Sequence, residues 1–93
     1  MQDNKIKFVL YTRPNCHFCD LTKAWLQNTG AMEKIDYKEY NIFEKSEEGQ
    51  AALKKLQDLN IMGVPYIEVT TIDGQTHTIN GYDEESLQKL IFG

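Results

Sequence analysis

The sequence predicts an α/β fold in which one mixed four-stranded sheet is flanked by helices. The apolar patterns follow the order β-α-β-α-β-β-α along the chain, and 93 residues provide room for one domain, residues 1–93. The first βαβ unit should cross over in the right-handed sense, which makes its two strands parallel. The hairpin that follows should extend the same sheet in antiparallel fashion.

The first half of the chain predicts strand, helix and strand. Residues 5–11 are rich in β-branched and aromatic side chains and end at a turn-forming cluster, which predicts a buried strand. From Phe18 to Thr29 the apolar positions recur at helical spacing, and a glycine follows as a stop signal. Residues 34–42 alternate with one slip of phase, and this pattern favours a second strand.

The second half predicts a helix, a hairpin and a short helix. Ser46 is a predicted N-cap, with acidic residues in the first turn after it, for a helix that ends near Asn60. Residues 66–72 and 76–79 flank a strong Asp-Gly turn signal, which predicts a β-hairpin. Asp83 is the predicted cap of the last helix.

The composition excludes several classes of function. With 10 Lys and Arg against 14 Asp and Glu, the chain lacks the basic surface that nucleic-acid binding needs. Its longest apolar run, residues 8–11, is far too short to span a membrane, and residues 1–5 carry no export signal. We therefore expect a cytoplasmic monomer that has neither a nucleic-acid nor a membrane partner.

Both cysteines lie in one Cys-x-x-Cys motif, Cys16 to Cys19. At the start of a helix this spacing puts both thiols on one face, within the distance that a disulfide requires. The helix N-terminus, with Arg13 and Lys23 nearby, favours the thiolate of Cys16, which is therefore the predicted nucleophile. Cys19, further inside the helix, is the predicted resolving thiol. His17 should face solvent and tune the thiolate.

The same motif is also half of a zinc site. A tetrahedral site needs two more ligands, and only His17 and His77 remain. His17 lies between the cysteines and is poorly aimed to join them. We therefore expect no metal site, and the predicted βαβ context favours redox chemistry instead.

Two further segments are candidate binding elements. Val64-Pro65 stands directly before a strand, where the proline either opens the strand or forms a cis peptide that turns the Val64 backbone toward a peptide-like ligand. The turn at residues 80–83 leads into a helix start that can bind a carboxylate, while Asp83 can accept a hydrogen bond from an ammonium group. An ordinary turn followed by an N-cap is the alternative for this segment.

Together, the segments at 11–19, 64–65 and 80–83 resemble the three landmarks of a glutaredoxin, in order and at glutaredoxin spacing. The resemblance covers nearly the whole chain. It implies the thioredoxin fold and a glutathione-dependent thiol–disulfide oxidoreductase that reduces protein disulfides and glutathione mixed disulfides. It implies no permanently bound cofactor, with glutathione as co-substrate, and it makes ribonucleotide reductase a candidate client.

The resemblance also implies roles for single residues. Cys16 would be the nucleophile and Cys19 the resolving thiol. The glutathione-binding residues would be Arg13 at a carboxylate, the Val64 backbone beside the cysteinyl part, a cis-Pro65, and Tyr82 with Asp83 at the γ-glutamyl end.

The chain departs from the family pattern at three places. His17-Phe18 replaces the common Pro-Tyr, Gly63 stands where many members have threonine, and Asn80 replaces the first residue of a glycine pair. Three alternatives therefore stay open: a thioredoxin-like dithiol donor reduced by a flavoprotein, a metal or iron–sulfur module that uses Cys16 with external thiols, and an inert interaction domain that keeps the fold.

Overall fold

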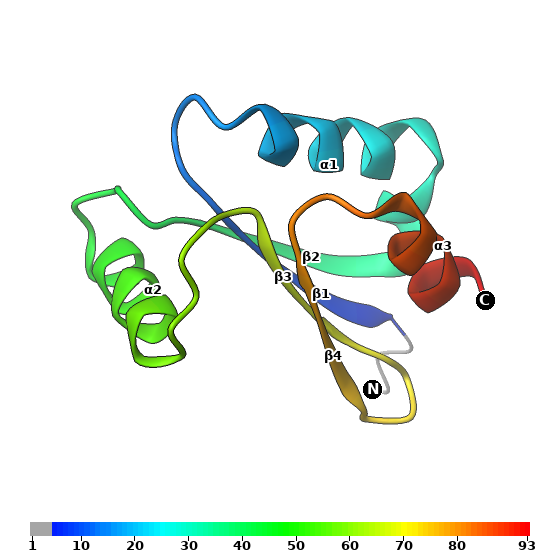
Figure 1. The fold of residues 1–93 in the computed structure, drawn as a ribbon. Coiled ribbons are helices and arrows are strands. Elements are labelled where there is room, and N and C mark those ends of the chain that lie inside the picture. Colours follow the sequence, from blue (N-terminus) through cyan, green and yellow to red (C-terminus); the bar gives the residue numbers. More distant parts are fainter. Residues whose placement is uncertain (1–4) are drawn as a thin grey trace.

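The computed structural model describes residues 5–93 and shows the predicted order of elements (Figure 1). Its helices and strands are β1 (Ile6–Thr12), α1 (His17–Asn28), β2 (Ile35–Asn41), α2 (Glu47–Asp58), β3 (Tyr66–Thr70), β4 (Thr76–Asn80) and α3 (Glu84–Phe92). A short 3-10 helix that the sequence did not predict, η1 (Ala31–Lys34), joins α1 to β2. Residues 1–4, on which the export-signal expectation rested, lie outside the described residues.

The four strands form one mixed sheet in the order β2-β1-β3-β4. β1 runs parallel to β2, while β3 is antiparallel to both β1 and β4. In this register Tyr66 lies between Tyr11 and Asn80. One end of the sheet is therefore formed by the end of β1, the start of β3 and the end of β4. The three predicted site segments meet at this end.

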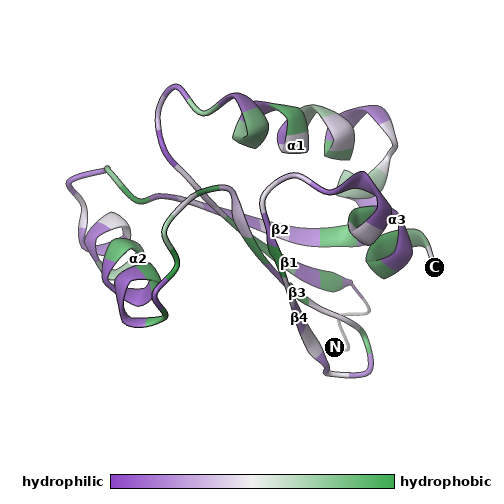
Figure 2. Cartoon of the chain, viewed as in Figure 1, coloured by the Kyte–Doolittle hydropathy of each residue, from purple (hydrophilic) through white to green (hydrophobic). Residues whose placement is uncertain are grey.

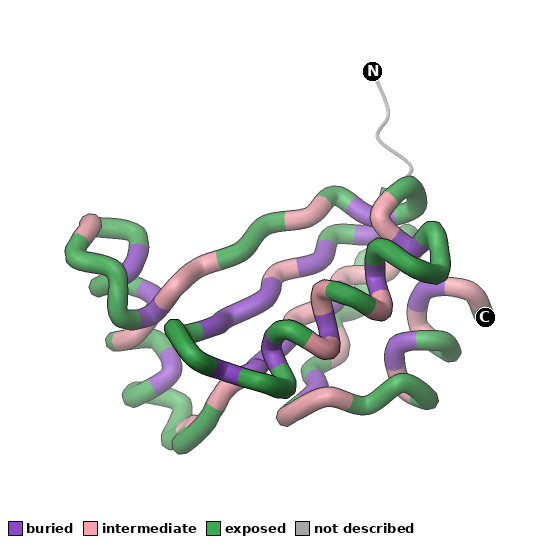
Figure 3. The backbone as a smooth tube through the Cα atoms, turned by 90° about the horizontal axis from the view of Figure 1, so that it is seen from above, coloured by how far each residue is buried: buried purple, intermediate pink, exposed green. Residues whose placement is uncertain are grey.

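Two helices cover one face of the sheet and one helix covers the other (Figures 1 and 2). α1 and α3 pack on a large apolar cluster, whereas α2 packs on a smaller one that includes Tyr11 and Tyr66. Figure 3 shows the buried positions gathered along the central strands and the inner faces of the helices. The fully buried side chains of the larger cluster include Phe8, Leu10, Leu26, Ile67, Val69 and Leu87.

Side-chain caps determine where two of the helices begin. The Ser46 hydroxyl accepts a hydrogen bond from the Gly49 N–H at 3.0 Å, and the Asp83 carboxylate accepts one from the Ser86 N–H at 3.3 Å. Both caps were predicted, and each satisfies a backbone donor that the helix leaves without an intrahelical partner.

The slip of phase in β2 has a physical cause. Tyr37 stacks on Phe8 and Glu39 pairs with a residue of α1, so both face the α1 side of the sheet. Tyr40 packs with the cluster under α2. A position on the α1 side, which an apolar residue would normally occupy, is thus taken by the partly exposed Glu39 carboxylate. No helix among residues 5–93 is both long and apolar enough to cross a membrane.

Candidate active site

The two cysteines form a disulfide at the N-terminus of α1, with their Cα atoms 5.2 Å apart. Cys16 is the N-cap residue, one position before the first helical residue, whereas the spacing had predicted it in the first turn. Its Sγ atom accepts a hydrogen bond from the Cys19 N–H at 3.2 Å. Asn15, with φ 57°, turns the chain into the helix, and asparagine tolerates this left-handed conformation. The helix start thus directs a backbone donor at the Cys16 sulfur.

Burial distinguishes the two cysteines only slightly. Cys16 is 6% exposed and Cys19 is 1% exposed. Cys19 lies on the inner face of α1 with the fully buried Thr22. Cys16 is therefore the sulfur nearer to solvent, and Cys19 lies behind it.

The Val64-Pro65 segment lies directly beside the cysteines. The peptide bond between the two residues is cis, one of the two alternatives that the sequence left open. The Val64 carbonyl oxygen is 3.9 Å from the Cys16 Sγ atom. The Pro65 carbonyl accepts a hydrogen bond from the Gly81 N–H at 2.8 Å, which ties the third predicted segment to the second. The fold therefore brings all three segments together.

Arg13 and Val64 line the same groove, of about 450 Å³, which is bounded by α2 and by the loops after β1, after β2 and before β3. Phe43, Gln57 and Met62 are among the other lining residues, which the sequence did not predict as part of the site. Phe43 is 58% exposed and Met62 is 96% exposed, so the groove has an apolar rim beside its one guanidinium group. Phe43 could have been noticed as an aromatic residue that fits neither the preceding strand pattern nor the following helix pattern.

Tyr82 and Asp83 lie in the turn next to Pro65, but their polar groups already have partners. The Tyr82 hydroxyl donates to the Glu84 carboxylate at 2.5 Å, and this bond raises the pKa of Tyr82 to about 12. Asp83 accepts from the Ser86 hydroxyl at 2.8 Å in addition to its N-cap bond, and the Ser86 contacts lower the pKa of Asp83. A ligand at Asp83 would have to share the carboxylate with Ser86.

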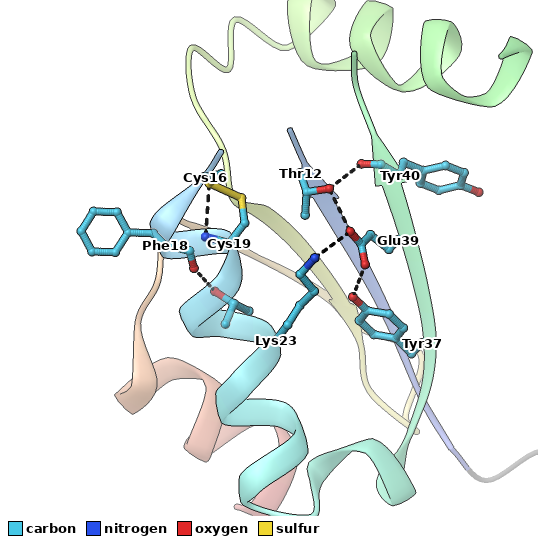
Figure 4. A network of polar contacts seen from close by, with 9 residues as sticks. Thr12, Cys16, Phe18, Cys19, Lys23, Tyr37, Glu39 and Tyr40 are labelled. Carbon is cyan, nitrogen blue, oxygen red and sulfur yellow. Dashed lines mark hydrogen bonds and ion pairs between the residues drawn. A yellow bond between two sulfur atoms is a disulfide. The ribbon is translucent and has the colours of Figure 1, made fainter. Parts of the chain in front are cut away.

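A polar network behind the cysteines was not predicted (Figure 4). The Glu39 carboxylate accepts hydrogen bonds from the Tyr37 hydroxyl at 2.8 Å, the Thr12 hydroxyl at 3.0 Å and the Lys23 ammonium at 3.2 Å. Burial alone would raise the pKa of Glu39, but the three hydrogen bonds outweigh it and lower the pKa. The phase slip at residues 39 and 40 was the signal in the sequence for a carboxylate on this side of the strand.

The remaining predictions concern His17 and metal binding. His17 is exposed, as predicted, and packs edge-on against Phe18 with ring centroids 5.5 Å apart. Across residues 5–93, no group of three or more His, Cys, Asp or Glu side chains is arranged to hold a metal ion.

A redox-active Cys-x-x-Cys pair at the start of α1, on a sheet of this topology, defines a thiol oxidoreductase of the thioredoxin fold. The chain matches the Glutaredoxin family over residues 8–75, and it belongs to that family.

Solved structures share the fold. A glutaredoxin from Archaeoglobus fulgidus superposes with a TM-score of 0.67 at 24% identity, over 92% of this chain and 86% of that one. A thioredoxin-fold protein from Helicobacter pylori superposes with a TM-score of 0.69 at 18% identity, over 97% of this chain and 71% of that one. The thioredoxin of Malassezia sympodialis superposes with a TM-score of 0.64 at 18% identity, over 96% of this chain and 74% of that one. No curated protein sequence matches this chain.

Proposed function

We propose that this chain is a glutathione-dependent thiol–disulfide oxidoreductase that reduces protein disulfides and glutathione mixed disulfides. The observation that carries the proposal is the position of the Cys16 sulfur, at a helix N-terminus and 3.9 Å from the Val64 carbonyl oxygen. A thiolate is stabilised at a helix N-terminus. The neighbouring backbone offers a surface on which a peptide-like ligand can lie.

The proposed reaction has two exchange steps. The Cys16 thiolate attacks one sulfur of the substrate disulfide; the other sulfur leaves as a thiolate and takes up a proton, so that a mixed disulfide remains on Cys16. Cys19 then loses its proton and attacks the Cys16 sulfur, which releases the second substrate thiol and closes the disulfide. Two glutathione molecules restore the dithiol and become glutathione disulfide. For a glutathione mixed disulfide, Cys16 alone suffices.

Glutathione is proposed to lie along the groove beside Cys16. Arg13 would meet the glycyl carboxylate, with the Gln57 amide on the same groove wall as a further donor. The Val64 backbone would lie beside the cysteinyl part, next to Pro65. Tyr82 and Asp83 would hold the γ-glutamyl end, Asp83 through the carboxylate that Ser86 also uses. No permanently bound cofactor is needed.

The cellular setting is part of the proposal. We propose a cytoplasmic monomer, with ribonucleotide reductase among its disulfide-containing clients. Each client would present its disulfide at Cys16, next to the apolar rim formed by Phe43 and Met62.

One observation favours a second candidate, a thioredoxin-like donor that a flavoprotein reduces. The Asp83 carboxylate, which the glutathione proposal needs, is already engaged by Ser86, and Gly63 has no side chain to offer a ligand. Such a donor would use the same cysteines without binding glutathione.

A coupled assay separates the two candidates. The oxidised protein is supplied with glutathione and glutathione reductase in one reaction, and with thioredoxin reductase in the other, each with NADPH and a disulfide substrate. We expect turnover with the glutathione system. Turnover with thioredoxin reductase alone would replace the first candidate by the second.

A further inference from the structure

The inner face of α1 carries one charged residue, and it lies one turn beyond the resolving cysteine. Cys19, Thr22, Lys23 and Leu26 share this face, because they are spaced at i, i+3, i+4 and i+7. Cβ atoms at i and i+4 on a helix are about 5–6 Å apart, so the Lys23 stem starts beside Cys19. Its ammonium reaches across to the Glu39 carboxylate on β2, at 3.2 Å (Figure 4).

The Glu39 carboxylate is held in place from three directions. The Thr12 hydroxyl binds the same oxygen as Lys23, and the Tyr37 hydroxyl binds the other oxygen. The side chains of Lys23 and Glu39 are 36% and 31% exposed, so water screens them only in part. Fixed charges in such a setting act on a neighbouring thiol more strongly than charges in bulk water do.

We propose that Lys23 and Glu39 are an opposed pair of positioning charges that set the reduction potential of the Cys16–Cys19 disulfide. The Lys23 ammonium favours thiolate in the reduced protein and so stabilises the dithiol. Glu39 opposes this effect, because it draws the ammonium toward β2 and offsets its charge. The proposal rests on the thiol–disulfide chemistry proposed above, but it does not require glutathione to be the physiological reductant.

The other charged groups near the motif are less constrained. Arg13, His17 and Asp20 are exposed, and water screens their charges. Lys23 and Glu39 are the pair whose geometry is fixed by hydrogen bonds to two strands.

Reduction potentials of four proteins test the proposal: wild type, Lys23→Gln, Glu39→Gln and the double variant. Each is equilibrated in dithiothreitol redox buffers, where the protein disulfide plus dithiol reductant gives the protein dithiol plus oxidised dithiothreitol. Asp36→Asn is the matched control, because Asp36 is an exposed carboxylate of the same strand.

We expect opposite shifts. Glu39→Gln should make the protein more oxidising, by about threefold to tenfold in the exchange equilibrium constant, and tenfold corresponds to about 30 mV. Lys23→Gln should make it more reducing by a similar factor. The double variant should return close to wild type, because both charges are removed together, and the control should not move.

If the ion pair had only a structural role, its loss would shift the reduction potentials of both single variants in the same direction. That result would overturn the proposal, and so would reduction potentials that differ from wild type by no more than that of the control. If Glu39→Gln does not fold, Lys23→Gln alone decides, since a potential that is unchanged or more oxidising contradicts the role of its ammonium. A failure of the proposed function would look different, because the wild-type protein would then show no reversible dithiol–disulfide equilibrium at all.

Discussion

The Sγ atom of Cys16 lies 3.9 Å from the carbonyl oxygen of Val64, although 48 residues separate the two in the sequence. The contact exists because β1 and β3 are antiparallel neighbours, so the loop after β1 meets the loop before β3 at one sheet edge. A ligand that paired with the Val64 backbone would therefore lie beside the proposed nucleophile.

Arg13→Ala should weaken glutathione use more than general dithiol reactivity. Arg13 lines the groove next to Val64, and its guanidinium is the charged group there that suits a carboxylate. We expect the KM for glutathione to rise by roughly tenfold, the effect of one charge-assisted hydrogen bond. Oxidation of the dithiol by a small neutral disulfide should change little. Lys7→Ala, at the opposite end of β1, is the control. If Arg13→Ala lowered activity equally in both assays, Arg13 would act on the thiolate instead.

Asp83 has two separable roles, in capping α3 and in the proposed binding of glutathione. Asp83→Ala should lower the melting temperature, because the Ser86 N–H loses its acceptor. Asp83→Asn should keep the cap, since asparagine is an equally good N-cap residue, and yet raise the KM for glutathione through loss of the charge. Unchanged glutathione kinetics in Asp83→Asn would remove this residue from the binding site.

Glu39 should make the stability of the protein depend on pH in the acid range. Its pKa is lower in the folded protein than its ordinary value of 4.5, so the carboxylate stabilises the fold above that pH. This contribution should be lost as the pH falls through the folded-state pKa. Urea unfolding should therefore show that Glu39→Gln lowers the free energy of unfolding more at roughly pH 7 than at roughly pH 3. A difference that does not vary with pH would contradict the network.

Gly49→Ala should destabilise the protein although it places alanine in a helix. A Cβ atom at this position would come within 2.9 Å of the Asn41 carbonyl oxygen and even closer to that of Glu44, and both are backbone atoms. We expect a loss of about 1–3 kcal/mol in the free energy of unfolding. Gly63→Ala is the matched control, because nothing lies within 4 Å of its added Cβ, and it should change stability by less than about 0.5 kcal/mol.

Local patterns were sufficient to predict the helices and strands and their order along the chain. The periodicity of α1 and α2, the caps at Ser46 and Asp83, and the Asp-Gly turn each depend on residues close together in the chain, and all appear in the structure. The η1 helix was missed because residues 31–34 form less than two helical turns and leave no periodic signal.

The site was predicted in its segments rather than in its contacts. The cysteine motif and Val64-Pro65 could be found in the sequence, because each is a short run of residues. The groove wall at Gln57 could not, because it depends on which side chains α2 places beside the loops. The phase slip marked Glu39 as unusual, but its partners could not be predicted, because they lie on β1, α1 and β2. The engagement of Asp83 by Ser86 likewise appears only once both side chains are placed.

Trapping of a mixed disulfide distinguishes the roles proposed for the two cysteines. The Cys19→Ser variant, reduced and then mixed with glutathione disulfide, should accumulate a mixed disulfide on Cys16, because no resolving thiol remains to release it. Mass spectrometry of the intact protein and of the peptide containing Cys16 should show one added glutathionyl group. Cys16→Ser should show less adduct, since Cys19 lies behind position 16, away from solvent, and is not at the helix N-cap. No adduct on Cys16, or a stable adduct on Cys19 in the Cys16→Ser protein, would contradict the assignment.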